Sequence, residues 1–334
     1  KLLVITFSIL ALTGCSSDKD TSSDVDKTKE TTTESNAKTE DDKYVIGVTI
    51  PRLSNPFFGR AIEIIEAYAD ELDNVKLIVM DAEDESATQV QQVEDFISMK
   101  VDGVLAAPVV SDGFVLAAET LKEASIPLVT CDRMVNSEDI LAHVGGNNVV
   151  GGEVAAEYIA EQLGEGNHKV AMLLGPLGAS PTNDRKEGFD KIMKDYPNIT
   201  VIEETGNFKR SEGMTVAENM LQANPDIKAI FSHNEEMGLG AIEALQALGY
   251  DPGEIVVVAF DTHLETMAAV DNGWLQGNVE QFPDAQFKTA LDILLANLKD
   301  GTKPEKVYNY LDPKVITKDN IEESEKYEDY KASL

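Results

Sequence analysis

The chain from residue 44 onward alternates between short apolar runs rich in β-branched residues and longer segments whose apolar residues recur with the period of a helix. Apolar runs of this length predict strands, and the longer amphipathic segments predict helices. The predicted strands span residues 44–50, 76–81, 103–107, 127–131, 169–174, 200–205, 229–232 and 255–260. The predicted helices span residues 57–72, 88–99, 113–124, 149–163, 184–196, 211–221, 235–248 and 264–272. Regular alternation of strand and helix indicates an α/β fold in which helices cover both faces of parallel sheets.

The rhythm of strands and helices changes around residues 142–152. A short apolar strand is followed by the stretch Gly145-Gly146-Asn147-Asn148, after which the alternation of strands and helices begins again. We interpret this stretch as a crossing between two lobes. Each lobe is expected to be a doubly wound parallel sheet.

The first 43 residues have a different pattern from the rest of the chain. The apolar run over residues 2–12 has the layout of an export signal, and it is shorter than the roughly 20 residues of a membrane span. The tetrad LTGC at residues 12–15 resembles the lipobox of bacterial lipoproteins, which implies a signal peptide over residues 1–15 and a lipid on the thiol of Cys15. An ordinary secretory signal with an incidental cysteine is the alternative. Residues 16–43 are almost all polar, which predicts a disordered acidic tether on an extracytoplasmic, membrane-anchored protein.

Charge and cysteine content narrow the classes of partner. The formal net charge of the 334 residues is −32. Nucleic acids are bound through clustered Lys and Arg, so we expect no nucleic-acid partner. Cys15 and Cys131 are the two cysteines, and with Cys15 lipidated no disulfide framework is expected.

Polar and aromatic side chains follow the predicted strands at their carboxyl ends. In an open parallel sheet, ligands bind outside the carboxyl ends of the strands. Aromatic rings stack on the C–H faces of a sugar ring, while carboxylates, amides and guanidiniums pair with its hydroxyl groups. This combination of side chains predicts a sugar site. Its candidate residues are Asn55, Phe57, Phe58, Asp132, Arg133, Asn183, Phe208, Asn234, Asp261 and Gln281.

Each of these assignments has a structural alternative. The alternative for the aromatic pair at residues 57–58 is packing in the hydrophobic core. The alternative for the charged pair at residues 132–133 is an ion pair on the surface. Asn234 and Asp261 both precede predicted helices, where either is suited to be an N-cap. Gln281 has the alternative role of a hinge residue that bonds only to backbone.

Several signals for other chemistry are incomplete. The carboxylate cluster over residues 81–85 lacks the glycine and the spacing of a calcium loop. The four histidines are scattered without the paired spacing of a zinc site, and no nucleophile motif such as G-x-S-x-G is present. We therefore expect no metal, no cofactor and no enzymatic activity.

Six short motifs follow one another along the chain. They are Asn55-Pro56-Phe57-Phe58, Cys131-Asp132-Arg133, Arg185-Lys186-Glu187-Gly188-Phe189, Asn234-Glu235-Glu236-Met237-Gly238-Leu239-Gly240-Ala241, Phe260-Asp261 and Gln281-Phe282-Pro283-Asp284. In order and spacing, these motifs resemble the ribose-binding type of bacterial periplasmic binding protein, and the resemblance extends from about residue 44 to residue 318. The resemblance implies that two similar lobes, joined by three hinge strands, close on a monosaccharide and deliver it to the permease of an ABC importer.

The same resemblance implies how the chain is divided. An N-terminal lobe is expected from residues 44–146 and 282–311, and a C-terminal lobe from residues 147–281 and 312–318. Residues 319–334 form a charged tail without an assigned role.

The chain departs from the ribose-binding pattern at three positions. Pro51, Ala107 and Asn183 stand where ribose binders carry hydrogen-bonding or basic side chains. A site built to pair a hydroxyl group discriminates strongly against ligands that do not match it, so these changes point to a pentose or hexose that need not be ribose. Arg52 and Arg185 are the residues available to replace the missing groups.

The most specific prediction is therefore a monomeric sugar-binding lipoprotein of an ABC importer, which works by hinge closure and has no catalytic step. Sugar-responsive repressors share the two-lobed core, but an acidic segment stands where their DNA-binding helices would precede it. Two alternatives remain open. One is a sensor component that presents its ligand to a receptor, and the other is a binder of a non-sugar ligand such as a furanone signal or a nucleoside.

Overall fold

The computed structural model describes residues 43–334. The lipobox with Cys15 and most of the predicted tether lie outside these described residues. The elements of the described part run in the order strand, helix, strand through most of its length, as the hydrophobic pattern predicted.

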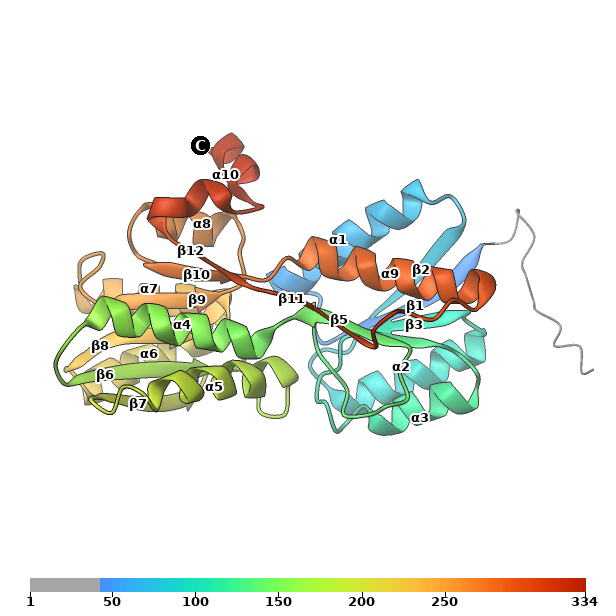
Figure 1. The fold of residues 1–334 in the computed structure, drawn as a ribbon, viewed down its shortest axis with the longest axis horizontal. Coiled ribbons are helices and arrows are strands. Elements are labelled where there is room, and N and C mark those ends of the chain that lie inside the picture. The colour runs from blue at the N-terminus through green and yellow to red at the C-terminus, as the bar shows by residue number, and fades with distance from the viewer. Residues whose placement is uncertain (1–42) are drawn as a thin grey trace, which may run out of the picture. The chain divides into compact units, whose positions relative to one another are not determined.

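The first sheet is parallel throughout and has the order β11-β5-β4-β3-β1-β2. Its middle strands are apolar and buried on both faces, which is typical of parallel sheets that helices cover on both sides. Helices α1 and α9 pack on one face, and α2 and α3 on the other (Figure 1). The strands are β1 (Tyr44–Ile50), β2 (Val75–Asp81), β3 (Gly103–Ala106), β4 (Leu128–Cys131), β5 (Ala142–Gly146) and β11 (Tyr308–Leu311). The helices are α1 (Pro56–Glu71), α2 (Ser86–Met99), α3 (Val115–Glu123) and α9 (Pro283–Asp300).

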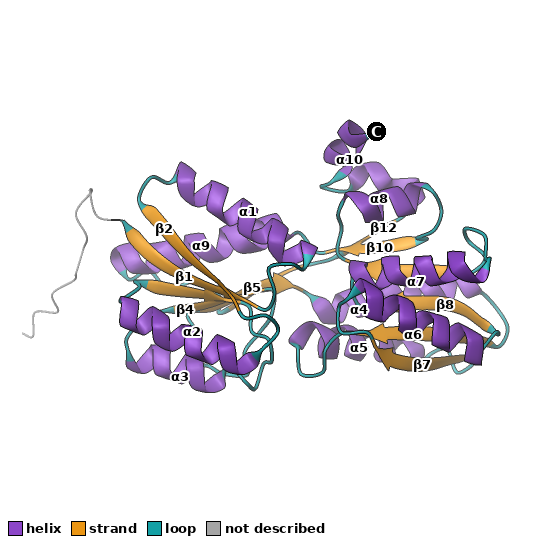
Figure 2. Ribbon diagram, turned by 180° about the vertical axis from the view of Figure 1, so that it is seen from behind, coloured by secondary structure: helices purple, strands orange, loops and turns teal. Residues whose placement is uncertain are grey.

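The second sheet repeats this architecture with the order β12-β10-β9-β8-β6-β7. Helices α4 and α5 cover one face, and α6 and α7 the other (Figure 2). The strands are β6 (His168–Leu174), β7 (Ile199–Thr205), β8 (Ile227–Ser232), β9 (Val256–Phe260), β10 (Gly277–Glu280) and β12 (Lys314–Ile316). The helices are α4 (Asn148–Leu163), α5 (Ser180–Met193), α6 (Arg210–Ala223) and α7 (Glu235–Leu248).

Three further helical segments stand at the β12 edge of the second sheet. They are α8 (Leu264–Asp271), the short 3₁₀ helix η1 (Lys318–Glu323) and α10 (Tyr327–Ser333). In both figures α10 lies over α8, close to β12 and β10. Strand β12 pairs with β10 in the antiparallel direction, so the second sheet is not purely parallel, in contrast to the prediction.

The chain passes from one sheet to the other three times. The crossings follow β5, β10 and β11, since each of these elements is followed by one that belongs to the other sheet. We call the first sheet with its helices lobe 1, and the second sheet with its helices lobe 2. The predicted fold of two α/β lobes joined by hinge strands is thus confirmed.

The two lobes contact each other beyond the carboxyl ends of their strands. The backbone N–H of Ser111 in lobe 1 donates to the carbonyl oxygen of Gly178 in lobe 2, at 3.0 Å. The backbone N–H of Met134 donates to the hydroxyl of Ser180, at 2.8 Å. Because these bonds join residues of different lobes, they exist only in this closed arrangement.

Candidate ligand-binding site

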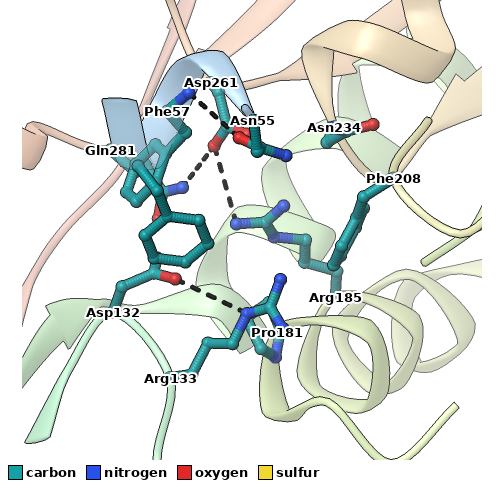
Figure 3. Close-up of a pocket in the computed structure, with 11 residues that line it drawn as sticks. Asn55, Phe57, Asp132, Arg133, Pro181, Arg185, Phe208, Asn234, Asp261 and Gln281 are labelled. Carbon is teal, nitrogen blue, oxygen red and sulfur yellow. Dashed lines mark hydrogen bonds and ion pairs between the residues drawn. The ribbon is translucent and has the colours of Figure 1, made fainter. Parts of the chain in front are cut away.

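A pocket lies between the two lobes at the ends of their parallel strands (Figure 3). The cavity has a volume of about 20 Å³, which is close to the space that one water molecule needs. Lobe 1 contributes Asn55, Phe57, Phe58, Asp132 and Arg133. Lobe 2 contributes Pro181, Arg185, Phe208, Asn234, Asp261 and Gln281.

The start of α1 places an amide and two aromatic rings in this pocket. Asn55 is the N-cap of α1, and its side-chain oxygen accepts a hydrogen bond from the backbone N–H of Phe57 at 3.0 Å. Pro56 occupies the first turn, where its missing N–H costs nothing. The rings of Phe57 and Phe58 meet edge to face with their centres 5.2 Å apart. Both rings also belong to the core of lobe 1, so their positions are fixed by packing as well as by the cap.

The end of β4 brings a carboxylate and a guanidinium into the pocket. Asp132 is 5% exposed and Arg133 is 4% exposed, so this is a buried pair and not the surface ion pair that was the alternative. The nitrogen Nε of Arg133 lies 3.9 Å from Oδ2 of Asp132. Burial raises the pKa of Asp132 to about 7, although the nearby guanidiniums of Arg133 and Arg185 act in the opposite direction.

The guanidinium of Arg133 connects the aromatic rings of the two lobes. Its central carbon lies 5.3 Å from the centre of the Phe58 ring and 5.4 Å from the centre of the Phe208 ring. A cation over an aromatic face is attracted by the negative face of the ring. The nitrogen Nε of Arg133 is buried without a hydrogen-bond partner in the protein. The pocket therefore presents a polar group between two aromatic surfaces.

Lobe 2 contributes a hydrogen-bonded network around the carboxylate of Asp261. Gln281 donates from Nε2 to Oδ1 of Asp261, and Nη2 of Arg185 lies 3.7 Å from the same oxygen (Figure 3). Arg185 is itself held on three sides. Its Nε donates to Oδ1 of Asn148 at 2.8 Å, its Nη1 donates to the carbonyl of His233, and its guanidinium lies 3.7 Å from the centre of the Phe260 ring.

Burial sets the protonation of this network. Because desolvation disfavours the charged form, the pKa of Asp261 is raised, while the nearby Arg185 partly opposes the shift. For the same reason the pKa of Arg185 is lowered. Glu235, which follows the pocket residue Asn234, is 2% exposed. Burial raises the pKa of Glu235 to about 8.

Asn234 caps a helix in the structure, whereas Asp261 does not. Asn234 is the N-cap of α7, with its side-chain oxygen 3.0 Å from the backbone nitrogen of Met237, and it also lines the pocket. Asp261 does not cap α8, because His263 is the N-cap there. Gln281 bonds to a carboxylate side chain, so it is not restricted to backbone partners.

Three pocket residues have backbone conformations that are rare for residues other than glycine. The φ angles of Asp132, Phe208 and Asp261 are 60°, 56° and 70°. This left-handed region is tolerated by Asp and is uncommon for a bulky residue such as Phe. Residues of this kind are retained where the surrounding structure holds them, and they concentrate at functional sites. Here they turn the side chains that follow β4, β7 and β9 toward the space between the lobes.

Asn183 is the predicted site residue that does not line the pocket. Its side chain is exposed, whereas Arg185 is buried. Two residues along a helix correspond to a rotation of about 200°, so these side chains point in nearly opposite directions. Pro181 and Arg185 are four residues apart and share the face of α5 that meets the pocket. Gly188 and Phe189 continue the same buried face at helical spacing, and this pattern in the sequence indicates that Arg185 faces inward.

The positions that depart from the ribose-binding pattern in lobe 1 are buried. Pro51 and Ala107 are not among the residues that line the pocket. The loop that contains Ala107 is fixed by Gln89, which donates to the carbonyl of Ala107 and accepts from the backbone N–H of Val109, both at 2.8 Å. Arg52 is held by Asp84 at 2.6 Å and reaches the carbonyl of Phe208 at 3.5 Å. Lobe 1 therefore supplies few polar groups besides Asn55 and the 132–133 pair.

Residues 43–334 offer neither a metal site nor a membrane-spanning helix. No group of three or more His, Cys, Asp or Glu side chains in this range is arranged to hold a metal ion. Every helix in the same range is too short or too polar to span a membrane.

The sequence of this chain matches the model of one protein family, the periplasmic binding protein domain, over residues 46–303. The chain therefore belongs to the periplasmic binding protein family. This is a family of extracytoplasmic binding proteins, which agrees with the prediction of binding without catalysis.

Individual relatives support the same assignment. The ribose import binding protein of Bacillus subtilis (strain 168) is 38% identical over 250 residues, which cover 75% of this chain and 80% of that protein. The myo-inositol binding protein of Caulobacter, solved with bound myo-inositol, has a TM-score of 0.81 at 28% identity, covering 86% of this chain and 97% of that chain. The binding protein of the arabinose ABC transporter from Shewanella sp. ANA-3, solved with L-arabinofuranose, has a TM-score of 0.80 at 28% identity, covering 86% of this chain and 96% of that chain.

Proposed function

We propose that this protein binds a monosaccharide between its two lobes and delivers it to the permease of an ABC importer. The observation that carries the proposal is the composition of the pocket. Two carboxylates and two guanidiniums line it together with amides and aromatic rings. The formal charges balance, so the pocket suits an uncharged ligand that offers hydroxyl groups and apolar ring faces, which is a description of a sugar.

The position of the pocket between the lobes implies how such a ligand enters. Side chains of both lobes line it, and hydrogen bonds join the lobes. The lobes therefore have to open before binding, and they close again over the ligand. Closure brings Phe208 and Asp261 of lobe 2 against Phe58 and Asp132 of lobe 1. A ligand shifts this equilibrium only by its higher affinity for the closed state, so the residues of lobe 2 govern closure.

The relatives support a polyol ligand and leave its identity open. Those named above bind or import ribose, myo-inositol and L-arabinofuranose. Pro51 and Ala107 leave lobe 1 with fewer polar groups than ribose binders have, so we propose a pentose or hexose other than ribose as the first choice.

A thermal-shift panel on the full chain tests this proposal. Ribose, L-arabinose, galactose, myo-inositol and a nucleoside are each added at increasing concentration. A ligand at 100 times its dissociation constant adds about 2.7 kcal/mol to the free energy of unfolding. We expect a large upward shift of the melting temperature with one or two of the sugars other than ribose. A shift with the nucleoside alone, or with none of the compounds, would exclude a monosaccharide binder of this specificity.

We also propose that Cys15 carries a lipid that anchors the protein to the outside of the membrane. The support is the LTGC tetrad after an apolar run. Two acyl chains, with about 0.8 kcal/mol for each buried CH₂ group, give a stable anchor. We expect the full chain expressed in a bacterium to be found in the membrane fraction, and Cys15→Ser to be released from it. Cys131→Ser is the matched control, and equal membrane recovery of all three proteins would contradict the anchor.

A further inference from the structure

The C-terminal segment over residues 318–334, which contains η1 and α10, is anchored on lobe 2. Tyr330 is 5% exposed and packs with Met267 and Ile316. Its hydroxyl donates to Oδ2 of Asp271 in α8 at 2.8 Å. An aromatic side chain with a buried ring and a bonded hydroxyl fixes the position of a short helix that is too small to be stable alone.

From this anchored position the segment reaches both sides of the crossing between β10 and α9. The hydroxyl of Ser324 donates to Oε1 of Glu280, the last residue of β10, at 2.8 Å, in a buried contact. The Nζ of Lys326 lies 3.1 Å from Oδ1 of Asp284 in α9, which belongs to lobe 1. The Lys326 side chain is only 10% exposed, so this ion pair is more strongly shielded from water than a surface pair. Ser324 and Lys326 are two residues apart and are held together, since the backbone N–H of Lys326 donates to the Ser324 hydroxyl at 3.1 Å.

Arg60 of lobe 1 forms a second ionic contact with the C-terminal segment. It stands on α1, and its Nη2 lies 3.8 Å from Oδ2 of Asp284 and 3.9 Å from Oδ2 of Asp329. Asp329 belongs to α10 and moves with lobe 2. Two charged side chains of the segment thus meet the charges of lobe 1, while its aromatic anchor and Ser324 stay on lobe 2.

The crossing that the segment spans also carries a pocket residue. Gln281 follows Glu280 directly and donates to the carboxylate of Asp261. We propose that the C-terminal segment is a clasp across this hinge, which stabilises the closed arrangement of the lobes and positions Gln281 for binding. The inference rests on the opening and closing of the lobes in the proposed function, and it does not depend on which ligand the pocket takes.

Amide hydrogen exchange of the full chain, measured without sugar, tests the clasp. The backbone N–H groups of Ser111 and Met134 bond across the lobes, so their exchange reports lobe opening directly. We expect Lys326→Met and Asp284→Asn each to speed the exchange of these two amides by about two- to fivefold. This is the change in the opening equilibrium expected when one partly exposed ion pair is lost. Lys331→Met is the matched control, because the ammonium of Lys331 lies 5.7 Å from the ring of Tyr327 within the same segment.

Two internal reporters separate a clasp from general loss of structure. The amide of Val48, inside β1, reports lobe 1 itself and is expected to be unchanged. The amide of Tyr330, which bonds to the carbonyl of Lys326 at 2.9 Å, reports whether α10 is still folded. Unchanged exchange at Ser111 and Met134 in both variants would overturn the clasp, and so would equal acceleration at Val48. Because no sugar is present, failure of the sugar panel would leave this result standing.

Discussion

The carboxylate of Asp261 links two other pocket residues of lobe 2. It accepts from Gln281 and faces the guanidinium of Arg185 at 3.7 Å. Its backbone has a φ angle of 70°, which turns the side chain toward the space between the lobes. A carboxylate held in this way is available to accept a hydrogen bond from a hydroxyl group of a ligand, without first losing water to bulk solvent.

Replacing Asp261 with Ala is expected to weaken sugar binding by about 2 kcal/mol or more, the amount expected for the loss of a charged hydrogen-bond partner. The measurement is titration calorimetry with the sugar that gives the largest thermal shift. Asp251→Ala is the control, since Asp251 is exposed in a turn. Equal affinities of the three proteins would show that Asp261 does not contact the ligand.

Asp132 makes the stability of the protein depend on pH. Burial raises its pKa from 3.8 to about 7, so the folded protein holds this proton more tightly than the unfolded chain does. Its contribution to the free energy of unfolding is therefore complete below about pH 4 and is lost as the pH rises through about 7. We expect Asp132→Asn to gain stability relative to the natural chain over this range, by at most about 1.4 kcal/mol per pH unit.

Urea unfolding of both proteins at a series of pH values between 4 and 8 measures this difference, with Asp251→Asn as the control. A constant difference in the free energy of unfolding between Asp132→Asn and the natural chain would contradict the raised pKa.

At the scale of elements, helix α5 shows how one face of a helix builds the pocket. Pro181 and Arg185 lie on the face that meets the pocket, and Asn183 is exposed on the other side. The apolar pattern predicted this helix over residues 184–196, whereas it begins at Ser180 and ends at Met193. The pattern alone did not determine which side chains face inward, because that depends on how the helix is rotated against the second sheet.

We expect Arg185→Gln to lower the free energy of unfolding by about 3–5 kcal/mol, because it leaves the buried Asp261 carboxylate without its cationic partner. Asn183→Ala, two residues away on the exposed face, is expected to stay within about 0.5 kcal/mol of the natural chain. Chemical denaturation of the two variants provides the comparison. A large loss for Asn183→Ala, or none for Arg185→Gln, would mean that α5 is rotated differently.

The elements that sequence patterns predicted well are those whose burial is uniform. Strands such as β3 and β4 are buried along their whole length, and their apolar runs were sufficient to locate them. Strand β12 has three residues, and its partner β10 lies more than thirty residues earlier in the chain. The local sequence pattern therefore predicts neither the direction of β12 nor the strand with which it pairs. The charged helix α10 is held mainly by Tyr330, and two tyrosines in a short polar segment give no extended periodic signal.

At the scale of the whole molecule, the site exists only because two lobes meet. Residues from both lobes line the pocket, and the loops around it are joined by the Ser111–Gly178 and Met134–Ser180 hydrogen bonds. The sequence indicated the residues of each lobe through their positions after the strands. It did not indicate the interlobe bonds, which depend on the angle between the lobes.

The most direct test of sugar binding between the lobes is a crystal structure of the full chain grown with the sugar that gives the largest thermal shift. We expect one sugar ring between Phe58 and Phe208, with its hydroxyl groups within hydrogen-bond distance of Asp132 and Asp261. A sugar bound elsewhere on the surface, with the side chains between the lobes unchanged, would contradict it.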